Sequence, residues 1–553
     1  MTRDYRLIDR ARFSGTDLQS HLIDGYAAGT VSRRDFMRHG SVLGLSLSLL
    51  GRIAGGGVFA AGAASPARAQ AGATIRVGQI MPAAAVEPVS VASAGGLILL
   101  QQVGEFLCVS GQDLVLRPVL AESWTPNDKA DVWTFKIRTG VKFHDGRPMS
   151  AKDVAASIAR LADPQNSSNA LSAFAGVLKP EGVSAPDDTT VVFSLDAPNG
   201  NFPYIVSSDN YNAIILPADY AGDFETTFNG TGSFKLERYE AKVGASFVRN
   251  EEYWGPKALP ARTEFKFYSD IQPMLLALQG GEVDILQQVP VLAGAGIVND
   301  PNFNVITLRS AAHQQLHMRN DMDPFKDKRV RRALALTLDR PSLVKGLMRG
   351  KAVEGNDSPF APVFPSTDQT VAQRGKNIEE AKQLLEAAGM GQGFQVTLTT
   401  QRYLEIPEYA QLVQSAAREI GVTIDLNVLD QGAYYGDAVF GKSNWLDSVL
   451  GITDYGHRGV PNVYLNAPLK SVGTWNAAHF KNADYDRMVE GYVAAGTLEG
   501  QLEYSGQIQR LLLDETPVIF GYFYDFIVVS SKALTGAQPT AMSQMFLDQA
   551  SLG

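Results

Sequence analysis

The chain of 553 residues contains a single cysteine, Cys108. One cysteine excludes an intramolecular disulfide framework and a zinc site built on several thiolates. Cys108 lies in the apolar stretch Phe106–Val109, and free cysteines are among the most frequently buried residues. We therefore expect Cys108 to be a buried and unreactive thiol.

The sequence also lacks an excess of positive charge. It has 49 Lys and Arg against 58 Asp and Glu, which gives a formal net charge of −9. Because nucleic-acid binding depends on clustered Lys and Arg that displace counterions, this balance predicts no nucleic-acid partner. The composition is 45% hydrophobic and 19% charged, which is typical of globular proteins, and the length favours two to four structural units.

The motifs of common hydrolases are missing downstream of residue 69. No nucleophile elbow of the form Gly-x-Ser-x-Gly and no phosphate-binding glycine loop occur there. His313 and His317 have the spacing of a zinc protease, but Gln314 occupies the position that needs a glutamate. The pair His144-Asp145 precedes Gly146 and favours a turn over a catalytic dyad. We predict no enzymatic activity, no cofactor and no metal site.

The N-terminal region has the layout of an export signal. Residues 32–38 are SRRDFMR, a small-residue apolar run covers 41–64, and Ala-Arg-Ala follows at 67–69. The arginine pair followed by Phe resembles a twin-arginine signal. Arg52 interrupts the run, which is rich in Gly and Ala and therefore too weakly apolar for a membrane span.

We therefore predict that residues 1–69 form a twin-arginine-type signal region, with cleavage after Ala69 and release of the product into the periplasm. Removal of these residues takes away nine Arg and five Asp, which leaves a net charge of −13. The alternative is an ordinary amphipathic helix that carries an arginine pair by chance.

Strand and helix patterns alternate along the rest of the chain. Residues 73–78, 132–137 and 190–195 alternate apolar and polar side chains, as half-buried strands do. Helix starts are predicted after Ser150, with Asp153 at the capping-box offset, and after Asn377 and Asp339. The interleaving predicts an α/β or mixed α+β class, and no short repeat is present.

Seven blocks of sequence resemble, in order, those of one known family. They lie at residues 120–154, 230–236, 249–255, 278–285, 324–339, 381–389 and 475–476. These blocks resemble the peptide/nickel class of solute receptors of ABC importers, which includes the dipeptide- and oligopeptide-binding proteins. The resemblance extends from about residue 73 to about residue 535, which is nearly the whole chain after the signal region.

The resemblance implies an α/β fold with two lobes, an additional domain and a two-strand hinge between the lobes. Carried over by motif order, lobe one comprises residues 70–112, 226–318 and 511–553, the extra domain comprises 113–225, and lobe two comprises 319–510. It also implies a monomeric periplasmic component that binds di- or oligopeptides between the lobes and delivers them to a membrane permease.

The resemblance further implies where such a ligand binds. Burying a zwitterion requires charged partners on the protein, because an unpaired buried charge is costly. Asp454 matches the position that binds the ammonium group in peptide receptors, and Arg402 matches the position that binds the carboxylate. Further candidates are the aromatic residues Tyr403, Trp445 and Tyr455 as walls, and the second cation Arg458.

Departures from the family pattern leave other ligands open. Ile452 stands where the family usually has an aromatic residue, and Arg458 motivates the hypothesis of an additional acidic group on the ligand. The alternatives are a receptor for an opine, an oligosaccharide or a metal chelate, a secreted hydrolase, or a periplasmic chaperone or signalling partner with the same fold.

Overall fold

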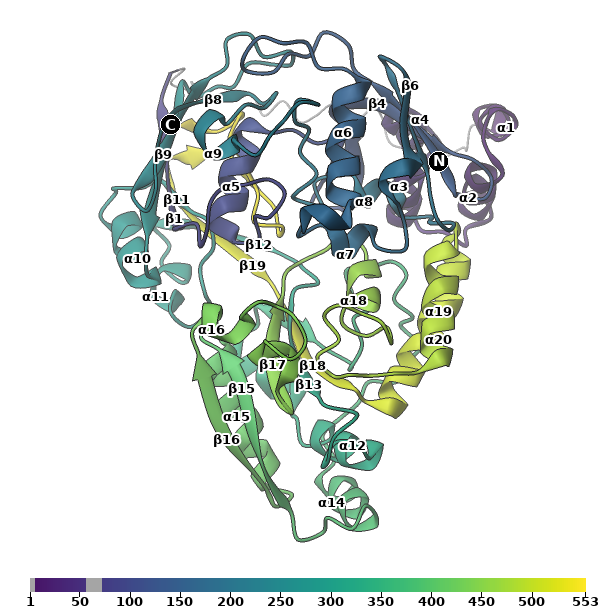
Figure 1. The fold of residues 1–553 in the computed structure, drawn as a ribbon, viewed down its shortest axis with the longest axis vertical. Coiled ribbons are helices and arrows are strands. Elements are labelled where there is room, and N and C mark those ends of the chain that lie inside the picture. Colours follow the sequence, from purple (N-terminus) through teal and green to yellow (C-terminus); the bar gives the residue numbers. More distant parts are fainter. Residues whose placement is uncertain (1–4, 56–71) are drawn as a thin grey trace.

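The computed structural model describes residues 5–55 and 72–553. A broad part contains two sheets, and a tapered part contains a third (Figure 1). We keep the names lobe one for the seven-stranded sheet with its helices, extra domain for the four-stranded sheet with its helices, and lobe two for the six-stranded sheet with its helices. Lobe one and the extra domain form the broad part, and lobe two forms the tapered part.

Lobe one is a mixed sheet built from distant parts of the chain. The strand order is β12 (Phe303–Leu308), β19 (Phe526–Ser531), β11 (Ile285–Leu286), β1 (Thr74–Ile80), β10 (Arg262–Tyr268), β9 (Gly244–Arg249), β8 (Phe234–Glu240). Its helices are α5 (Ala94–Val103), α9 (Phe224–Thr227), α10 (Ile271–Gln279) and α11 (Ala295–Val298). The strand predicted at 73–78 is confirmed as β1, which pairs with β10 in parallel.

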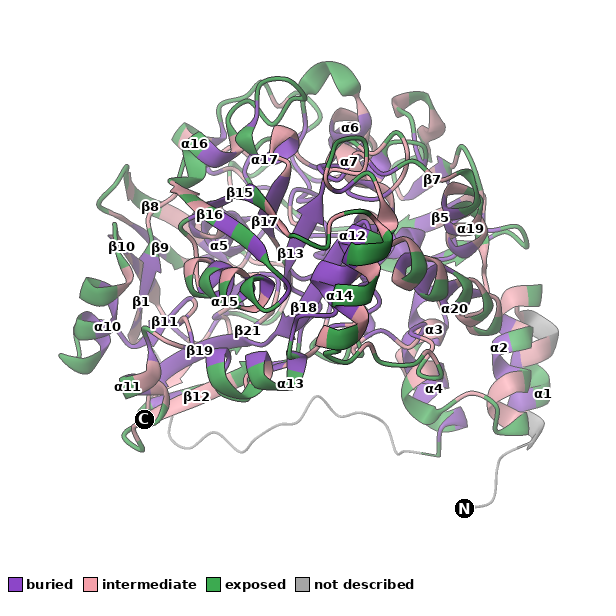
Figure 2. Cartoon of the chain, turned by 90° about the horizontal axis from the view of Figure 1, so that it is seen from below, coloured by how far each residue is buried: buried purple, intermediate pink, exposed green. Residues whose placement is uncertain are grey.

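Lobe two is a second mixed sheet. Its order is β14 (Ala352–Glu354), β18 (Val518–Tyr524), β13 (His313–Met318), β17 (Leu450–Tyr455), β15 (Phe394–Gln401), β16 (Val422–Leu429). Its helices are α12 (Lys328–Ala335), α13 (Arg340–Ser342), α14 (Ile378–Ala387), α15 (Ile406–Arg418), α16 (Gln431–Tyr435), α17 (Asn444–Asp447), α18 (Asn462–Asn466), α19 (Ala483–Ala494) and α20 (Leu498–Glu515). Every residue of β18 is buried, which explains its uninterrupted apolar sequence, and Figure 2 shows it within the buried centre.

The extra domain is an antiparallel sheet packed on a helix. Its order is β4 (Ala121–Pro126), β5 (Val132–Ile137), β7 (Thr190–Ser194), β6 (Val183–Asp187), with α6 (Ala151–Ala162), α7 (Leu171–Phe174) and α8 (Phe202–Ile205). The strands predicted at 132–137 and 190–195 are confirmed. Ser150 and Asp153 form the predicted capping box of α6, and Asn377 and Asp339 cap the starts of α14 and α13.

Three pairs of short strands complete the sheets. They are β2 (Cys108–Ser110) with β3 (Leu116–Pro118), β20 (Leu534–Thr535) with β23 (Ser551–Leu552), and β21 (Gln538–Pro539) with β22 (Met545–Phe546). Cys108 is buried and free, as predicted, and burial raises the pKa of its thiol well above the usual value.

Four helices precede lobe one in the chain, and they lie beside the extra domain (Figure 1). They are α1 (Tyr5–Ser14), α2 (Asp17–Ala28), α3 (Arg33–Val42) and α4 (Leu47–Ile53). In the described part of the chain, none of the helices combines the length and the apolar character that a bilayer crossing requires. The predicted cleavage site after Ala69 lies outside the described residues.

Two adjacent strands connect the lobes. The chain leaves β12 at Leu308 and enters β13 at His313, and it returns between β18 and β19 at Asp525. Ser310 Oγ donates a hydrogen bond to Tyr524 O at 2.5 Å, so the two crossings are held together. Because β13 and β18 pair within lobe two, we propose lobe boundaries at residues 309–312 and 525, rather than after 318 and before 511.

A buried ion network holds the outer part of lobe two. Asp357 is fully buried and accepts hydrogen bonds from Arg340 Nη2 and Arg374 Nη1, each at 2.6 Å, and from Phe520 N at 3.0 Å. Its backbone has φ 50°, a left-handed conformation that Asp and Asn tolerate better than most residues. The carboxylate therefore joins a loop, a helix start and the central strand β18.

We predict that Asp357→Asn lowers the free energy of unfolding by about 3–5 kcal/mol, because two buried guanidinium groups lose their counter-charge. Asn keeps the size and the backbone tolerance, so the change isolates the charge. Urea unfolding measures the effect, with Glu490→Gln as control, since the pair Lys470–Glu490 lies at the surface and exposed pairs contribute little. An equal loss of unfolding free energy in Asp357→Asn and Glu490→Gln would contradict the stabilising role assigned to Asp357.

Candidate ligand-binding site

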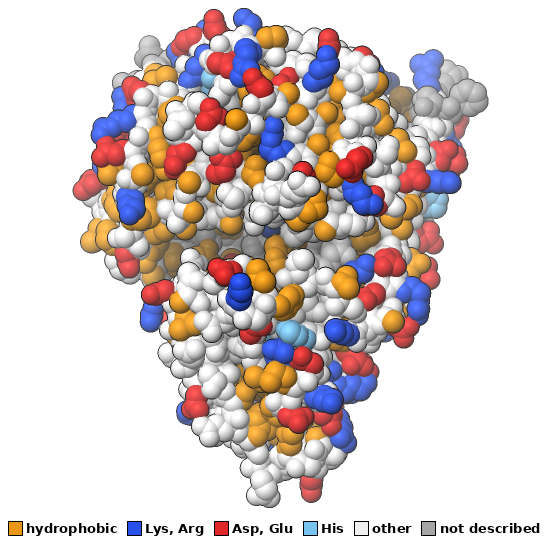
Figure 3. All heavy atoms as spheres, in the orientation of Figure 1, with side chains coloured by type: hydrophobic (Ala, Val, Ile, Leu, Met, Phe, Trp, Pro, Cys, Tyr) orange, Lys and Arg blue, Asp and Glu red, His pale blue; other side chains and the backbone are white. Residues whose placement is uncertain are grey.

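The candidate site lies where two parallel strands of lobe two end. β15 and β17 pair in parallel, with Thr400 opposite Ile452. Arg402 follows the end of β15, and Asp454 is the fifth residue of β17, so both lie at the carboxyl ends of neighbouring strands. Ligands of α/β proteins commonly bind at this edge of a sheet. The surface is hollowed along the boundary between the broad and tapered parts (Figure 3).

Asp454 is a partly buried carboxylate that no described cation neutralises. Its Oδ1 accepts a hydrogen bond from Tyr524 OH at 2.9 Å. Burial raises the pKa of Asp454 to about 7, the Tyr524 hydrogen bond lowers it, and the nearby carboxylate of Glu405 raises it further. A carboxylate held in this way favours a cation delivered from outside, because a positive charge restores its ordinary ionisation.

Glu405 is a second buried carboxylate beside Asp454, at the start of α15. Its Oε1 accepts a hydrogen bond from Leu292 N at 3.1 Å, which connects lobe two to a loop of lobe one. Burial raises its pKa. The two carboxylates make this end of the cleft negative.

The aromatic candidates all lie in lobe two but differ in accessibility. Tyr403 is partly buried, and its pKa is raised by burial and then by the charge of Asp454. Trp445 packs edge-on against Tyr435 with ring centroids 5.2 Å apart, and Tyr455 stacks on His313 at 5.4 Å. Trp445 and Tyr455 are buried, and their polar atoms have no hydrogen-bond partner of ordinary geometry among the described residues.

Arg402 is not brought to Asp454 by a direct contact. Its side chain is exposed, and its backbone N–H donates to Leu429 O at 2.8 Å. Among the described residues its guanidinium forms no ion pair, so it is free to meet a ligand carboxylate. Its role as a carboxylate partner stays a prediction.

Arg458 lies in a pocket between the extra domain and lobe two. Its guanidinium stacks 5.2 Å from the ring centroid of Tyr211, and its Nη1 donates to His457 O at 2.9 Å. The pocket has an accessible volume of about 50 Å³. The charges of Arg458 and Asp454 both influence the pKa of Tyr464. The pocket around Arg458 therefore lies close to Asp454.

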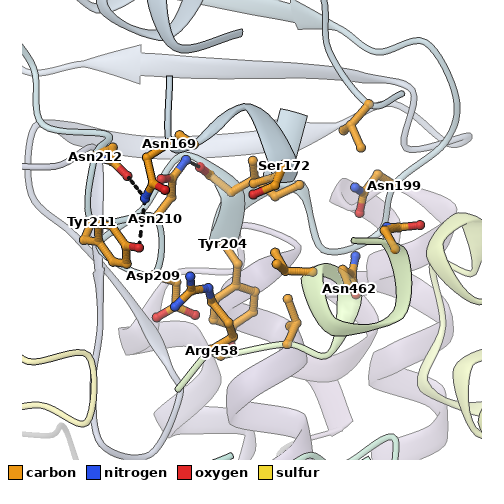
Figure 4. A pocket seen from close by; sticks show the side chains of 18 residues that line it. Asn169, Ser172, Asn199, Tyr204, Asp209, Asn210, Tyr211, Asn212, Arg458 and Asn462 are labelled. Atoms are coloured by element: carbon orange, nitrogen blue, oxygen red, sulfur yellow. Dashed lines mark hydrogen bonds between the residues drawn. The ribbon is translucent and has the colours of Figure 1, made fainter. Parts of the chain in front are cut away.

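The walls of this pocket are rich in amides (Figure 4). From the extra domain come Asn169, Asn199, Asn210 and Asn212, and from lobe two come Asn462 and Asn466. Asn169 Nδ2 donates to Tyr211 OH at 3.0 Å. Two of the amide nitrogens, Asn199 Nδ2 and Asn462 Nδ2, are buried and have no partner among the described residues. Buried donors of this kind favour a polar ligand that offers acceptors.

Several residues of the site were missed by the sequence patterns. Tyr524 contacts Asp454 from 70 residues away in the chain, and Asp209 and Tyr211 reach the pocket from the extra domain. No local motif marks these positions, because Tyr524 approaches Asp454 through strand pairing within lobe two, and Asp209 and Tyr211 reach the pocket through the packing of the extra domain on lobe two. Ile452, which stands in place of an aromatic residue, is fully buried in the core of lobe two.

The enzyme-like motifs have structural roles. His313 and His317 lie on the strand β13 and are buried, and burial lowers the pKa of each to about 4. The Nε2–H of His144 donates to Gly232 O at 3.0 Å, and Gly146 has φ 90° in the predicted turn. In the residues that the structure describes, no group of three or more His, Cys, Asp or Glu is arranged to hold a metal ion.

Two lobes joined by paired strands, around a cleft that carries an unneutralised carboxylate, define a solute-binding protein of the two-lobed type. The chain belongs to the bacterial extracellular solute-binding proteins, family 5, whose middle region matches residues 115–451, more than half of the chain. A probable peptide ABC transporter periplasmic-binding protein of Sinorhizobium fredii is 29% identical over 470 residues, which cover 78% of this chain and 85% of that relative.

Solved structures show the same fold. The periplasmic binding protein DppA of Helicobacter pylori, in complex with the peptide STSA, superposes with a TM-score of 0.75 and 20% identity over 87% of this chain and 98% of its own. AgaA of A. tumefaciens R10, in complex with agropinic acid, gives a TM-score of 0.74 and 21% identity over 87% and 99%. The predicted family and the two-lobed α/β fold are confirmed.

We predict that Asp454→Asn raises the melting temperature of the ligand-free protein, and that it does so clearly more at pH 8 than at pH 5. The pKa of Asp454 is about 7 in the folded protein and about 4 in an unfolded chain. The folded state therefore binds the extra proton between these values, and stability falls as pH rises from about 4 to 7. Asn mimics the protonated form.

Thermal melts at both pH values test this prediction, with Asp425→Asn as control because Asp425 is exposed on the edge strand β16 of the same sheet. If Asp454→Asn raised the melting temperature by the same amount at pH 5 and pH 8, the charge of Asp454 would not be the cause.

Proposed function

We propose that this protein is the periplasmic substrate-binding component of an ABC importer and that it carries peptides to a membrane permease. The observation that carries the proposal is the Asp454 carboxylate, which is partly buried between aromatic rings and lacks a described cationic partner. The free ammonium group of a peptide supplies that partner. The named relative of Sinorhizobium fredii, a probable peptide-binding protein, supports the same ligand class.

Arg402 and Arg458 complete the proposed recognition of a zwitterion. We assign binding of the ligand carboxylate to Arg402, which is exposed at the end of the adjacent strand. Its guanidinium can donate hydrogen bonds to both carboxylate oxygens at once. The amide-lined pocket beside Arg458 would accommodate a polar side chain or a second acidic group. Aromatic faces from Tyr403, Trp445 and Tyr455 would cover the peptide backbone.

A second candidate ligand is an opine, an amino acid derivative with several acidic and hydroxyl groups. Two observations favour it: the second cation Arg458 stands in a pocket lined by amides, and AgaA, which has the same fold, was solved with agropinic acid. An opine and a peptide differ in the number of anionic groups, so the contribution of Arg458 separates them.

For localisation we propose export by the twin-arginine route, with cleavage after Ala69 and release into the periplasm. Arg33 and Arg34 begin α3 and are exposed, so they are available to an export receptor. The mass of the protein recovered from the periplasm measures the cleavage position.

Calorimetric titration with a panel of dipeptides, tetrapeptides, opines and sugars tests the ligand class. For a peptide that binds, Asp454→Ala is expected to cost about 2–5 kcal/mol, roughly 30-fold to several thousandfold in Kd, because a buried ammonium loses its partner. Asp425 is exposed on the edge strand of the same sheet, and Asp425→Ala should leave affinity unchanged. Unaltered affinity in Asp454→Ala, or heat only from sugars, would reject the proposed site.

A further inference from the structure

The N-terminal helices are docked on the folded body by specific hydrogen bonds as well as apolar packing. The Trp124 indole N–H of the extra domain donates to Ser41 O at 3.1 Å and Val42 O at 2.9 Å. Leu116 N donates to Ser41 Oγ at 3.0 Å. Phe36 is fully buried and belongs to the same apolar cluster as the extra domain. The segment of residues 5–55 is therefore an integral part of the described structure.

Arg38 anchors this segment across two parts of the body. It is 4% exposed. Its Nε donates to Tyr204 OH of the extra domain at 3.2 Å, its Nη1 to Val363 O at 3.5 Å, and its Nη2 to Gly459 O. Val363 and Gly459 belong to lobe two. A planar guanidinium with donors pointing in several directions suits a junction of this kind, whereas a lysine could not bridge it in the same way.

A buried counter-charge lies behind the arginine. Asp209, on the wall of the amide-lined pocket, is buried, and one of its oxygens, Oδ2, has no hydrogen-bond partner among the described residues. Burial raises the pKa of Asp209 to about 6, and the positive charge of Arg38 is the largest influence that lowers it, followed by that of Arg458. Arg38 therefore stabilises a carboxylate that faces the cleft between the extra domain and lobe two.

The acceptors of Arg38 are far apart in sequence but close in the folded molecule. Tyr204, Val363 and Gly459 are 166, 325 and 421 residues away from Arg38. They meet only when the extra domain and lobe two have folded and approached each other. On the same helix, Arg33 and Arg34 point to solvent and are exposed. One arginine of this helix is therefore buried, and two are exposed to solvent.

We propose that residues 5–55 act as an intramolecular ligand of the folded receptor, with Arg38 in an arginine-accepting site that pins the extra domain to lobe two. While this segment is attached and docked, the cleft is held closed, and the exposed arginine pair is presented from a body that has completed folding. Loss of the segment frees lobe two to open. This inference goes beyond the proposed ligand class and is independent of which solute is bound.

Retention of the segment after cutting tests the site directly. A protease recognition sequence is placed between Gly55 and Gly72 of the full chain, the folded protein is cut, and the two pieces are separated by gel filtration. The N-terminal piece is expected to co-elute with the body, and Arg38→Met is expected to speed its dissociation at least tenfold. Arg38→Lys should give an intermediate rate, because it keeps the charge but loses the fork.

Arg33→Met is the matched control, because it removes an equal charge from the exposed face of the same helix. It should leave dissociation unchanged. Immediate separation of the wild-type pieces, or equal rates in Arg38→Met and Arg33→Met, would overturn the proposal. Thermal melts of each uncut variant exclude general unfolding as the cause.

A distance measurement tests the closure. Spin labels at Lys152→Cys on α6 and Glu490→Cys on α19 report on the separation of the extra domain and lobe two, since both positions are exposed and the native Cys108 is buried. Without added solute, the uncut wild type should give a single short distance, and the Arg38→Met protein, or the cut body after removal of the N-terminal piece, a longer or broader distribution. Identical distributions would show that the segment does not control closure.

Discussion

The structure depends on one unneutralised charge, the carboxylate of Asp454 at the edge of the lobe-two sheet. Burial between aromatic rings and the neighbouring Glu405 disfavour its ionised form, and the described part of the protein supplies no cation to offset this cost. Under the proposed function, a solute that carries an ammonium group offsets this cost when the cleft encloses it, which would couple binding to closure.

Tyr524 connects that charge to the hinge. Its hydroxyl donates to Asp454, its carbonyl accepts from Ser310 on the other crossing strand, and the next residue, Asp525, pairs with Arg309 at 3.0 Å. One residue thus contacts both the site and the two strands about which the lobes move. The N-terminal segment reaches the far side of the same cleft, where the charge of Arg38 favours the ionised form of Asp209. Burial disfavours the ionised forms of both Asp454 and Asp209.

The fold was largely predictable because the sequence features that indicate it are local or follow the order of the chain. The capping box at Ser150, the alternation at 132–137 and the ordered family blocks each depend on neighbouring residues, and the structure confirms them. Motif order alone identified Asp454 as a candidate site residue. The sequence did not predict the Tyr524 contact or the amide-lined pocket, since each joins segments that only tertiary packing brings together. The lobe boundaries that we propose from the structure differ from those predicted from the sequence, because β13 and β18 pair within the sheet of lobe two.

The most direct test of the central claim is the number of protons exchanged when a peptide binds. Calorimetry at pH 6 in buffers with different heats of ionisation measures this number. With a pKa of about 7 in the empty protein, Asp454 is mostly protonated at pH 6, and pairing with an ammonium group lowers its pKa. The account predicts release of nearly one proton, which Asp454→Asn abolishes. Binding with no proton release, or with proton uptake, would contradict it.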